Sequence, residues 1–501
     1  MIKTKFKTFE DFRRHILSRE TTSVQLKPEA LLSIALVFPN SYDIGMANLG
    51  FQAVYQILNS MSEVRCERAF FYPDFVEAAR TLETGRKLRD FDVIAFSISF
   101  ELDIPNIVQI LIDAGVTALN RNRDFREPLI LLGGAVTFIN PAPLSVFADL
   151  MVIGEIEPYA DQIFDFLKQA RIQHLSRQQM AEQLSPIPGV YFPDFPAKNQ
   201  PLVKSQLTLS KTMPQYSALL SPDSHFKNMF LVEVGRGCGR HCHFCAASYV
   251  YHPFRYFSVE KIIKTVHDHS ATARRIGLVG AAISDYPQLF QLCRALVDEG
   301  YELGLSSFRL DRLSPDFLNV LERAKLQSIS LAPEAGSEQL RSKLNKQLSH
   351  QQIIEAAQFL AASKIENIKL YFLIGLPAEQ WDDIEAIADL VAEINQIFVN
   401  HRTRKQVTVS INAFIPKPWT PFQWAPMART AELQKKRKHL EKRLKKLKNV
   451  VVSKKSVRAE ILQGILSLGD ASVGMAVYYR IKEHLPWSDS WKKAGVDVDC
   501  L

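Results

Sequence analysis

Short apolar runs alternate with amphipathic stretches along most of this chain of 501 residues, and this alternation constrains its fold more than any other feature. Within the amphipathic stretches, apolar residues return every three or four positions, as in helices with one buried face. Strands that alternate with such helices form parallel sheets, so the sequence predicts an α/β fold. Between residues 31 and 167 the expected strands are 33–38, 69–72, 93–97, 129–132 and 150–153.

A second series of the same kind begins at Met229, beyond a connector rich in proline. Six β/α units over about 190 residues are too few for a complete eight-unit barrel, which takes ~250 residues, so we expect a partial (β/α)6 barrel. The predicted domains are a Rossmann-like domain at 1–170, the connector at 171–227, the barrel at 228–428 and a helical C-terminal domain at 429–501. The expected barrel strands are 230–234, 276–279, 303–306, 328–331, 369–374 and 407–414.

Small and polar residues follow the strands of the first series. In open α/β sheets the carboxyl ends of the strands form the ligand crevice, and glycine there allows a ligand to approach the backbone. The first domain is therefore predicted to bind a ligand at this edge. The candidate contacts are Asn40, Ser41, Tyr42, Ser97, Ser99, Gly133, Gly134, Gly154 and Glu155.

The six cysteines are too sparse for the disulfide framework of a secreted protein. The amino terminus lacks a signal-peptide pattern, and no apolar run reaches the ~18–20 residues that span a bilayer. We therefore expect a cytoplasmic protein without a membrane span. Cys293 lies in a helical pattern that predicts a core position, and Cys66 and Cys500 have no predicted role. The remaining three, Cys238, Cys242 and Cys245, lie within eight residues and indicate a metal site.

The net charge of +8 comes from one segment. Residues 435–448 hold nine Lys or Arg and one Glu, so the rest of the chain is balanced. Leu433, Leu440, Leu444 and Leu447 fall on one side of a helix here, which predicts a packed amphipathic helix with a solvated basic face. The alternative is a contact with nucleic acid, an acidic protein substrate or an acidic electron donor of the flavodoxin or ferredoxin type. No RNA-binding signature accompanies the segment, which disfavours nucleic acid.

The cysteine cluster follows the first strand of the second series, in the sequence GRGCGRHCHFC that ends at Cys245. Loops at the carboxyl ends of the strands form the active face of a β/α barrel. Three thiolates can hold three irons of a [4Fe–4S] cube and leave the fourth iron open to an external ligand. The alternative is a structural zinc site completed by His241 or His243, although zinc prefers paired Cys-x2-Cys hooks and four closed ligands.

The Cys-x3-Cys-x2-Cys pattern, with Phe244 before the last cysteine, resembles the signature of the radical S-adenosylmethionine superfamily. The resemblance implies that the open iron chelates the amino and carboxylate groups of S-adenosylmethionine. An electron from the cluster then cleaves the sulfonium to a 5′-deoxyadenosyl radical. Phe244 matches the aromatic residue that contacts the adenine.

Later strand ends carry further residues that this resemblance implies for S-adenosylmethionine. Gly280 and Ala281 fall where the family binds the methionine amino group, but without the acidic residue of the commonest version, so only their backbone would contact it. Ser307 and Arg309 follow the next strand, where a cation can clamp a carboxylate.

Two more positions complete this set. Glu334 follows the fourth strand, where an acceptor can hold the ribose hydroxyls, and Gly375 follows the fifth, in a loop that resembles the one behind the adenine. Each position alone could be an ordinary turn or a surface ion pair. The order in which they follow successive strands is what favours a radical enzyme.

The first domain resembles the cobalamin-binding domain of a group of radical enzymes that includes methyltransferases. Ser97–Ser99 with the stretches 131–135 and 152–157 carry this resemblance, and residues 38–51 and 417–424 resemble one branch of the group. The nine candidate contacts of the first domain would then line cobalamin. In all, the resemblance covers roughly residues 30–425. It implies that a substrate radical takes a methyl group from methylcobalamin, although nothing identifies the substrate as a particular small molecule or peptide.

One departure leaves alternatives open. Cobalamin folds often carry Asp-x-His-x-x-Gly after their first strand, whereas the loop at Asp43 has no His. Cobalamin can bind without a protein nitrogen ligand, the domain can be a degenerate scaffold, or it can bind another nucleotide-like ligand. Without cobalamin the radical would drive rearrangement, cyclisation or oxidation. The competing class is a non-catalytic protein, stabilised by zinc or a cluster, whose basic helix docks nucleic acid.

Overall fold

The computed structural model describes residues 6–75, 79–196, 202–270, 273–305, 307–403, 405–453 and 455–498. The chain forms two compact units. We call them the amino-terminal unit, which comprises Met1–Thr208, Gln215–Asn228 and Ile465–Leu501, and the barrel unit, which comprises Leu209–Pro214 and Met229–Gly464. The segment 429–501, predicted as one helical domain, is therefore divided, with its first part in the barrel unit and its last part in the amino-terminal unit.

The amino-terminal unit is built on a six-stranded sheet in the order β3-β2-β4-β5-β6-β7. The first five strands are parallel and β7 is antiparallel to β6. The strand order reverses between β2 and β4, and ligands of open α/β sheets bind at such a switch point. The strands are β2 (Leu32–Phe38), β3 (Val64–Phe70), β4 (Val93–Ser97), β5 (Leu129–Gly133), β6 (Leu150–Val152) and β7 (Val190–Tyr191).

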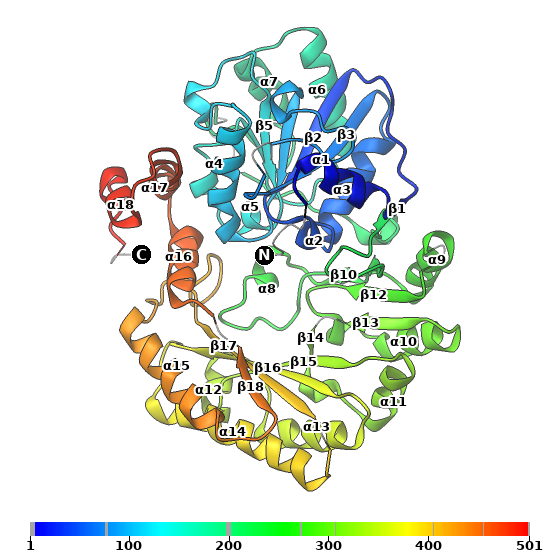
Figure 1. Ribbon diagram of the computed structural model, residues 1–501, viewed down its shortest axis with the longest axis vertical. Helices are drawn as coiled ribbons and strands as arrows, with labels where there is room; N and C mark the ends of the chain where they lie inside the picture. Colours follow the sequence, from blue (N-terminus) through cyan, green and yellow to red (C-terminus); the bar gives the residue numbers. More distant parts are fainter. Residues whose placement is uncertain are drawn as a thin grey trace. The chain divides into compact units, whose positions relative to one another are not determined.

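Helices cover both faces of this sheet, and all seven residues of β2 are buried. The continuous apolar runs seen in the sequence are typical of strands buried in this way. Figure 1 shows these helices around the sheet. They are α1 (Phe9–Leu17), α2 (Tyr42–Gly45), α3 (Leu49–Ser60), α4 (Ile104–Asp113), α5 (Ala135–Ile139), α6 (Ala160–Ile172) and α7 (Arg177–Leu184).

The last helices of the chain, α17 (Ala471–Lys482) and α18 (Trp487–Ala494), belong to this unit as well. A glycine makes the close packing of α17 possible. A Cβ atom at Gly474 would lie 2.2 Å from the carbonyl oxygen of Pro143, so any side chain there would collide with backbone. Asn140 adds two hydrogen bonds, from its Nδ2 to the carbonyl oxygens of Ser467 and Gly469. These contacts explain why the end of the chain does not form a domain of its own.

The barrel unit contains two parallel sheets, in the orders β13-β12-β9 and β14-β15-β16-β17-β18. The six strands predicted for the second series are all present. The run at 450–452, predicted within the C-terminal domain, adds β18, which pairs in parallel with β17. The strands are β9 (Phe230–Glu233), β12 (Arg275–Val279), β13 (Glu302–Leu305), β14 (Ser307–Phe308), β15 (Ser328–Glu334), β16 (Asn367–Ile374), β17 (Gln406–Ala413) and β18 (Val450–Ser453).

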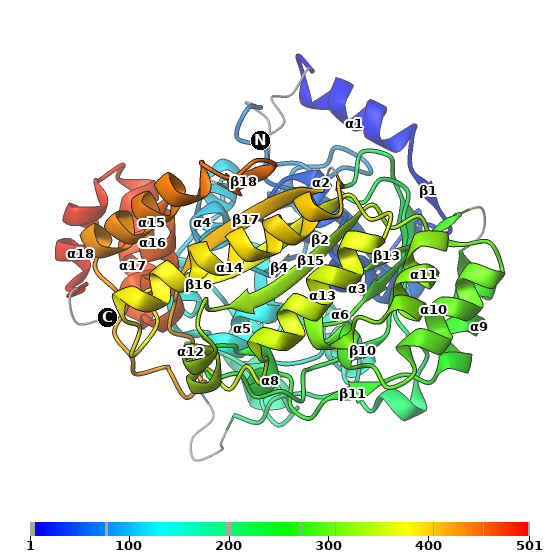
Figure 2. The ribbon, with the colours of Figure 1, turned by 90° about the horizontal axis from the view of Figure 1, so that it is seen from below.

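Helices lie on the outer face of these barrel sheets, as Figures 1 and 2 show. Three of them, α9, α11 and α13, begin at a serine whose hydroxyl caps the first turn; that of Ser258, for example, accepts from the backbone N–H of Lys261. The helices are α9 (Val259–His269), α10 (Leu289–Asp298), α11 (Pro315–Arg323), α13 (His350–Ala362), α14 (Trp381–Asn400) and α15 (Thr430–Leu444).

The basic segment begins as helix α15, and its leucines are buried at Leu433, Leu440 and Leu444. Two of its cations are buried with them. Lys436 pairs with Glu379 at 2.7 Å and Arg437 pairs with Glu460 at 2.8 Å. The helix is therefore a packed part of the barrel unit, as the leucine pattern predicted, but only some of its cations form the expected solvated face.

Cys66 in β3 and Cys293 in α10 are fully buried, which confirms the core position predicted for Cys293. Cys500 lies outside the described residues. Among the helices that the structure describes, none has the length and apolar character to cross a bilayer.

Candidate functional site

The cysteine loop begins directly after β9, at the carboxyl edge of the barrel sheet. Its first residues form β10 (Gly235–Arg236), which pairs with β11 (Arg255–Tyr256). Gly237 has a φ of 83°, and a Cβ there would lie 2.5 Å from the carbonyl oxygen of Tyr251. Glycine is therefore required at this turn, directly before Cys238.

The three thiols line one cavity of about 200 Å³. Much of the remaining lining comes from residues at or just after the ends of β12, β14 and β15, so four strand ends meet around the thiols. Ser248, Lys346 and Leu348 also line the cavity. Of the predicted contacts for S-adenosylmethionine, the cavity gathers Phe244, Ala281, Arg309 and Glu334. Four of the seven predicted contacts therefore lie around one cavity with the three thiols.

A short segment after α12 (Glu338–Lys343) braces the cysteine loop. The backbone N–H of His243 donates to the carbonyl oxygen of Leu344 at 3.0 Å. Asn345 donates from its Nδ2 to the carbonyl oxygen of His241, also at 3.0 Å, and its own carbonyl oxygen lies 3.8 Å from the Sγ of Cys242. Asn345 has a φ of 55°, a left-handed conformation that asparagine tolerates better than most residues. The brace was not predicted from the sequence.

Burial affects the protonation of two of the thiols. It raises the pKa of Cys242, and it raises the pKa of Cys245 to about 11. The loop therefore favours neutral thiols at these two positions, because a thiolate there would lose its hydration. Bound metal would supply the compensating positive charge.

The donor set suits a cluster of irons. Within the described parts of the chain, no three His, Cys, Asp or Glu side chains lie close enough to hold one metal ion between them. In a [4Fe–4S] cube each thiolate binds its own iron, so the three sulfurs need to surround the cube and not to meet at one point. The thiols of Cys238, Cys242 and Cys245 around a shared cavity fit that requirement.

Three cation–carboxylate pairs also line the cavity. Arg240 donates from Nε to Asp285 at 2.9 Å, and Arg309 binds both carboxylate oxygens of Asp311 at 2.9 Å. In the third pair, the Nζ of Lys346 lies 3.2 Å from the Oε1 of Glu334. Burial raises the pKa of Glu334, and Lys346 opposes that shift. The predicted carboxylate clamp, Arg309, is thus already held by an acidic partner.

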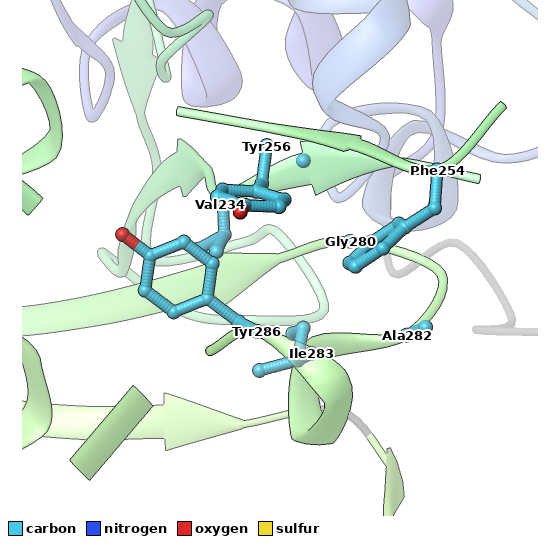
Figure 3. Close-up of a pocket in the computed structure, with 8 residues that line it drawn as sticks. Val234, Phe254, Tyr256, Gly280, Ala282, Ile283 and Tyr286 are labelled. Atoms are coloured by element: carbon cyan, nitrogen blue, oxygen red, sulfur yellow. The ribbon is translucent and has the colours of Figure 1, made fainter. Parts of the chain in front are cut away.

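Gly280 lies against a different, much smaller cavity, shown in Figure 3. That cavity measures about 10 Å³, which is at the limit for one water molecule. The rings of Tyr256 and Tyr286 meet edge to face beside it, with centroids 5.6 Å apart. A Cβ at Gly280 would lie 3.1 Å from the carbonyl oxygen of Gly235, so this glycine allows the strand end to approach the start of the cysteine loop.

Gly375 is not among the residues that line the thiol cavity. Its N–H donates to the carboxylate of Glu379 at 3.0 Å, and a Cβ there would lie 2.8 Å from the Cβ of Ala428. The next residue, Leu376, packs in the same apolar cluster as Phe244. Ser307 opens β14, but its side chain lies outside what the structure describes.

In the amino-terminal unit, several predicted contacts lie together at the carboxyl edge of the sheet. Ser97 and Gly133 are register partners at the ends of β4 and β5. Ser99 accepts from the Nδ2 of Asn48 at 2.9 Å. Gly134 has a φ of 103°, and a Cβ there would lie 2.6 Å from the carbonyl oxygen of Ile98. The backbone of Gly134 therefore packs against the backbone of Ile98.

Asn40 and Ser41 lie beside the switch point, where Ser41 precedes α2. The Nδ2 of Asn40 donates to the Oδ1 of Asp103 at 2.7 Å. Asp103 is buried, and burial raises its pKa to about 6, against the opposing effect of the Asn40 hydrogen bond. This carboxylate is not among the residues predicted from the sequence.

Three other predicted ligand contacts are engaged in packing or hydrogen bonding within the chain. The ring of Tyr42 is buried, and its hydroxyl donates to Glu20 at 2.6 Å. Gly154 forms a β-bridge with Ser205, where a Cβ would lie 2.3 Å from the Ser205 carbonyl oxygen. The carboxylate of Glu155 accepts from the backbone N–H of Leu207 at 2.5 Å. Both Gly154 and Glu155 thus hold the connector, which the sequence could not reveal.

Two sequence models match the chain. Residues 50–193 match the model for the N-terminal region of radical SAM proteins, and residues 232–391 match the model of the radical SAM superfamily, SAM being S-adenosylmethionine. An uncharacterised protein of Methanocaldococcus jannaschii is 28% identical over 450 residues, which are 89% of this chain and 91% of that protein.

Solved structures share the fold at low sequence identity. The radical S-adenosylmethionine methyltransferase TsrM from Kitasatospora setae, solved with cobalamin and a [4Fe–4S] cluster bound, has a TM-score of 0.54 and 12% identity, over 78% of this chain and 73% of TsrM. The cobalamin-dependent radical enzyme OxsB, solved with aqua-cobalamin and S-adenosylmethionine bound, has a TM-score of 0.52 and 15% identity, over 93% of this chain. This chain spans 62% of OxsB.

Proposed function

We propose a function from the premise that this chain belongs to the radical SAM superfamily, whose sequence models match residues 50–193 and 232–391. The chain is then a radical enzyme, and we infer that cobalamin takes part in its reaction. That reaction would be C-methylation, or related radical chemistry, of a small molecule or a peptide. The observation that most supports radical chemistry is the single cavity shared by the thiols of Cys238, Cys242 and Cys245.

These three thiols would hold a [4Fe–4S] cluster. When bound, the cluster supplies an open iron for S-adenosylmethionine and the electron that cleaves its sulfonium to a 5′-deoxyadenosyl radical. The chain's own contribution is to hold the sulfurs and to limit the access of water. The hydrogen bonds from the Leu344–Lys346 segment fix the loop, and the burial of Cys242 excludes solvent from one side.

S-adenosylmethionine would bind beside the thiols, where Phe244 and Ala281 supply apolar and backbone surface. Asp311 engages the Nε and Nη2 of Arg309, so the Nη1 donors of Arg309 would bind the ligand's carboxylate. Glu334 would accept from the ribose hydroxyls, and Ser307 would add its backbone. Gly280 and Gly375 would act indirectly, since their positions allow close packing of protein.

Cobalamin would occupy the carboxyl edge of the amino-terminal sheet, at Asn40, Ser41, Ser97, Ser99, Gly133 and Gly134. Two facts support this assignment: the strand order reverses between β2 and β4, and TsrM and OxsB were solved with cobalamin bound. Residues 39–50 contain no His, so the chain would bind without a nitrogen ligand from this loop.

Tyr42, Gly154 and Glu155 favour the second candidate, in which the amino-terminal unit is a scaffold without cobalamin. Their side chains or backbone are already engaged with the chain itself. In that case the same barrel cavity would drive rearrangement, cyclisation or oxidation. The two candidates differ in one observable, which is whether a corrin is retained.

The test is anaerobic reconstitution of the full chain with iron, sulfide and hydroxocobalamin. We expect about four irons per chain, which is the content of one cube, and 5′-deoxyadenosine when dithionite and S-adenosylmethionine are added. The triple variant with Cys238, Cys242 and Cys245 changed to Ala should do neither. Cys293→Ala is the matched control, because it removes a buried thiol outside the loop and should keep the cluster.

The outcomes separate the candidates. A retained corrin spectrum supports methyl transfer or related cobalt chemistry, and its absence supports the scaffold. A colourless protein that holds one zinc would overturn both. We also infer a cytoplasmic location, because an oxygen-sensitive cluster and free thiols need a reducing compartment.

The cluster needs an electron donor, and we propose that an acidic flavodoxin or ferredoxin docks on the exposed lysines of α15. Lys435, Lys438 and Lys442 are exposed, in contrast to the paired Lys436 and Arg437. Lys438→Glu combined with Lys442→Glu should raise the KM for such a donor and leave dithionite-driven cleavage unchanged. Equal KM values in the variant and the wild type would refute this docking site.

A further inference from the structure

The charges around the thiol cavity are balanced. Three cations and three carboxylates line it, and each cation has a nearest carboxylate. Arg309 also lies 4.0 Å from Asp285, the partner of Arg240, whereas Lys346 and Glu334 form a separate pair. Binding of irons would convert the three thiols to thiolates, and each added electron would make the cavity more negative. The balance therefore determines how readily the site accepts an electron, because buried charges interact strongly where water does not screen them.

The pair of Lys346 and Glu334 requires a strained backbone at Glu334. Glu334 has a φ of 71°, a left-handed conformation that is strained for a residue with a side chain. The strand register also shifts between Leu331 and Glu334, as at a β-bulge. Bulges redirect side chains near functional sites, and here the carboxylate lines the cavity. A surface ion pair formed by chance would not require this backbone.

The cation of this pair comes from the brace of the cysteine loop. Lys346 follows Asn345, whose amide and carbonyl contact the loop at His241 and Cys242. Its backbone N–H donates to the carbonyl oxygen of Arg341 at 2.9 Å, and its side chain is only 12% exposed. Lys346 is therefore fixed at both its backbone and its Nζ, and it lines the same cavity as the three thiols.

We propose that Lys346 is a positioning residue that acts with Glu334 to set the reduction potential of the cluster. The inference rests on the proposed function. The ammonium of Lys346 compensates the Glu334 carboxylate and holds it in place over the cavity. Loss of the ammonium leaves a buried carboxylate without its cation, and at a pH that keeps Glu334 ionised this negative charge disfavours the added electron. Loss of the carboxylate leaves an unpaired cation, which favours it.

The experiment is a redox titration of the reconstituted, anaerobic full chain at alkaline pH, which favours the ionised form of Glu334, followed by the electron paramagnetic resonance signal of the reduced cluster. Lys346→Met should shift the midpoint to a lower potential and Glu334→Gln to a higher one. We expect each shift to correspond to about a tenfold change in the reduction equilibrium, which is about 59 mV for one electron. The double variant should return close to the wild type, as should Lys346→Arg, which keeps the charge.

Each outcome bears on the proposal. Equal potentials in all loaded proteins, or shifts of the same sign in Lys346→Met and Glu334→Gln, would overturn it. If Lys346→Met holds no cluster while Lys346→Arg does, the need for a cation is supported. If neither holds a cluster while Glu334→Gln does, the shape of lysine matters and the proposal is wrong. A wild-type chain without a cluster would overturn the proposed function, which is a separate result.

Discussion

The carboxyl edges of the two parallel sheets differ in what their residues do. At the barrel edge, side chains with chemical function from four strand ends surround one cavity, and the charged groups in its lining form ion pairs. At the edge of the amino-terminal sheet, the glycines and several polar groups contact the chain itself, as Gly154 and Glu155 contact the connector. The position of a residue at a strand end therefore does not by itself distinguish a ligand contact from a packing contact.

The largest expected loss of stability concerns Gly154, at the edge of the amino-terminal sheet. Its φ is 118°, and a Cβ would lie 2.3 Å from the backbone oxygen of Ser205, so Gly154→Ala must move the connector. We expect a loss of about 3 kcal/mol in the free energy of unfolding of the amino-terminal unit. The measurement is thermal or urea unfolding of the full chain, with the cluster content determined in parallel.

Gly495→Ala is the matched control in the same unit. Gly495 also has a positive φ, 71°, but a Cβ there meets nothing within 4 Å. It should cost only about 1 kcal/mol, the strain of alanine in a left-handed conformation. If Gly154→Ala is as mild as Gly495→Ala, then Gly154 is not held by the connector, and a ligand contact becomes the better explanation for this glycine.

A smaller effect concerns Asp103, the buried carboxylate at the switch point. Its folded pKa of about 6 lies above the ordinary value of 3.8, because burial disfavours the charge. The folded state therefore binds more protons than the unfolded state between these values, and stability falls as the pH rises from about 4 to 6. Above pH 6 the penalty stays constant.

Asp103→Asn removes this penalty and keeps an oxygen that can accept from Asn40. We expect the variant to be more stable than the wild type at pH 7, by about 1 to 3 kcal/mol, and equal to it near pH 4. Urea unfolding at both pH values measures the difference. A variant that is less stable at pH 7 would show that the carboxylate is ionised to serve the fold, and the amino-terminal edge would then resemble the barrel edge more closely than we argue.

The sequence predicted those parts of the site where side-chain chemistry follows a strand. Cys238, Cys242, Cys245, Arg309 and Glu334 fall in this class, and one cavity gathers them. The roles of the glycines could not be predicted in this way. A glycine indicates that something lies close to its backbone, but the sequence does not show whether that is a ligand or another part of the protein. At Gly280 and Gly375 the neighbour is protein.

Contacts between segments far apart in the sequence could not be predicted either. Lys346 and Asn345 lie about a hundred residues from the cysteine loop, and nothing local in the sequence connects the two segments. Strand positions were predictable because buried parallel strands are continuous apolar runs. The three-residue run at 450–452 was too short to show that it joins the barrel sheet, which only its pairing with β17 reveals.

The smallest predicted effect concerns the brace at the barrel edge. Asn345→Ala removes the hydrogen bonds from Nδ2 to the carbonyl oxygens of Arg240 and His241. Their loss should weaken the loop by about 1 kcal/mol, which corresponds to roughly fivefold faster removal of iron by a chelator. Asn449→Ala is the control, because exposed Asn449 has a similar φ of 62° in the same unit but lies outside the brace. Both variants lose an asparagine from a left-handed turn, so backbone strain changes equally. Equal rates of iron loss in the two variants would mean that Asn345 supports only its own turn, and that the cysteine loop keeps its shape without the segment that follows α12.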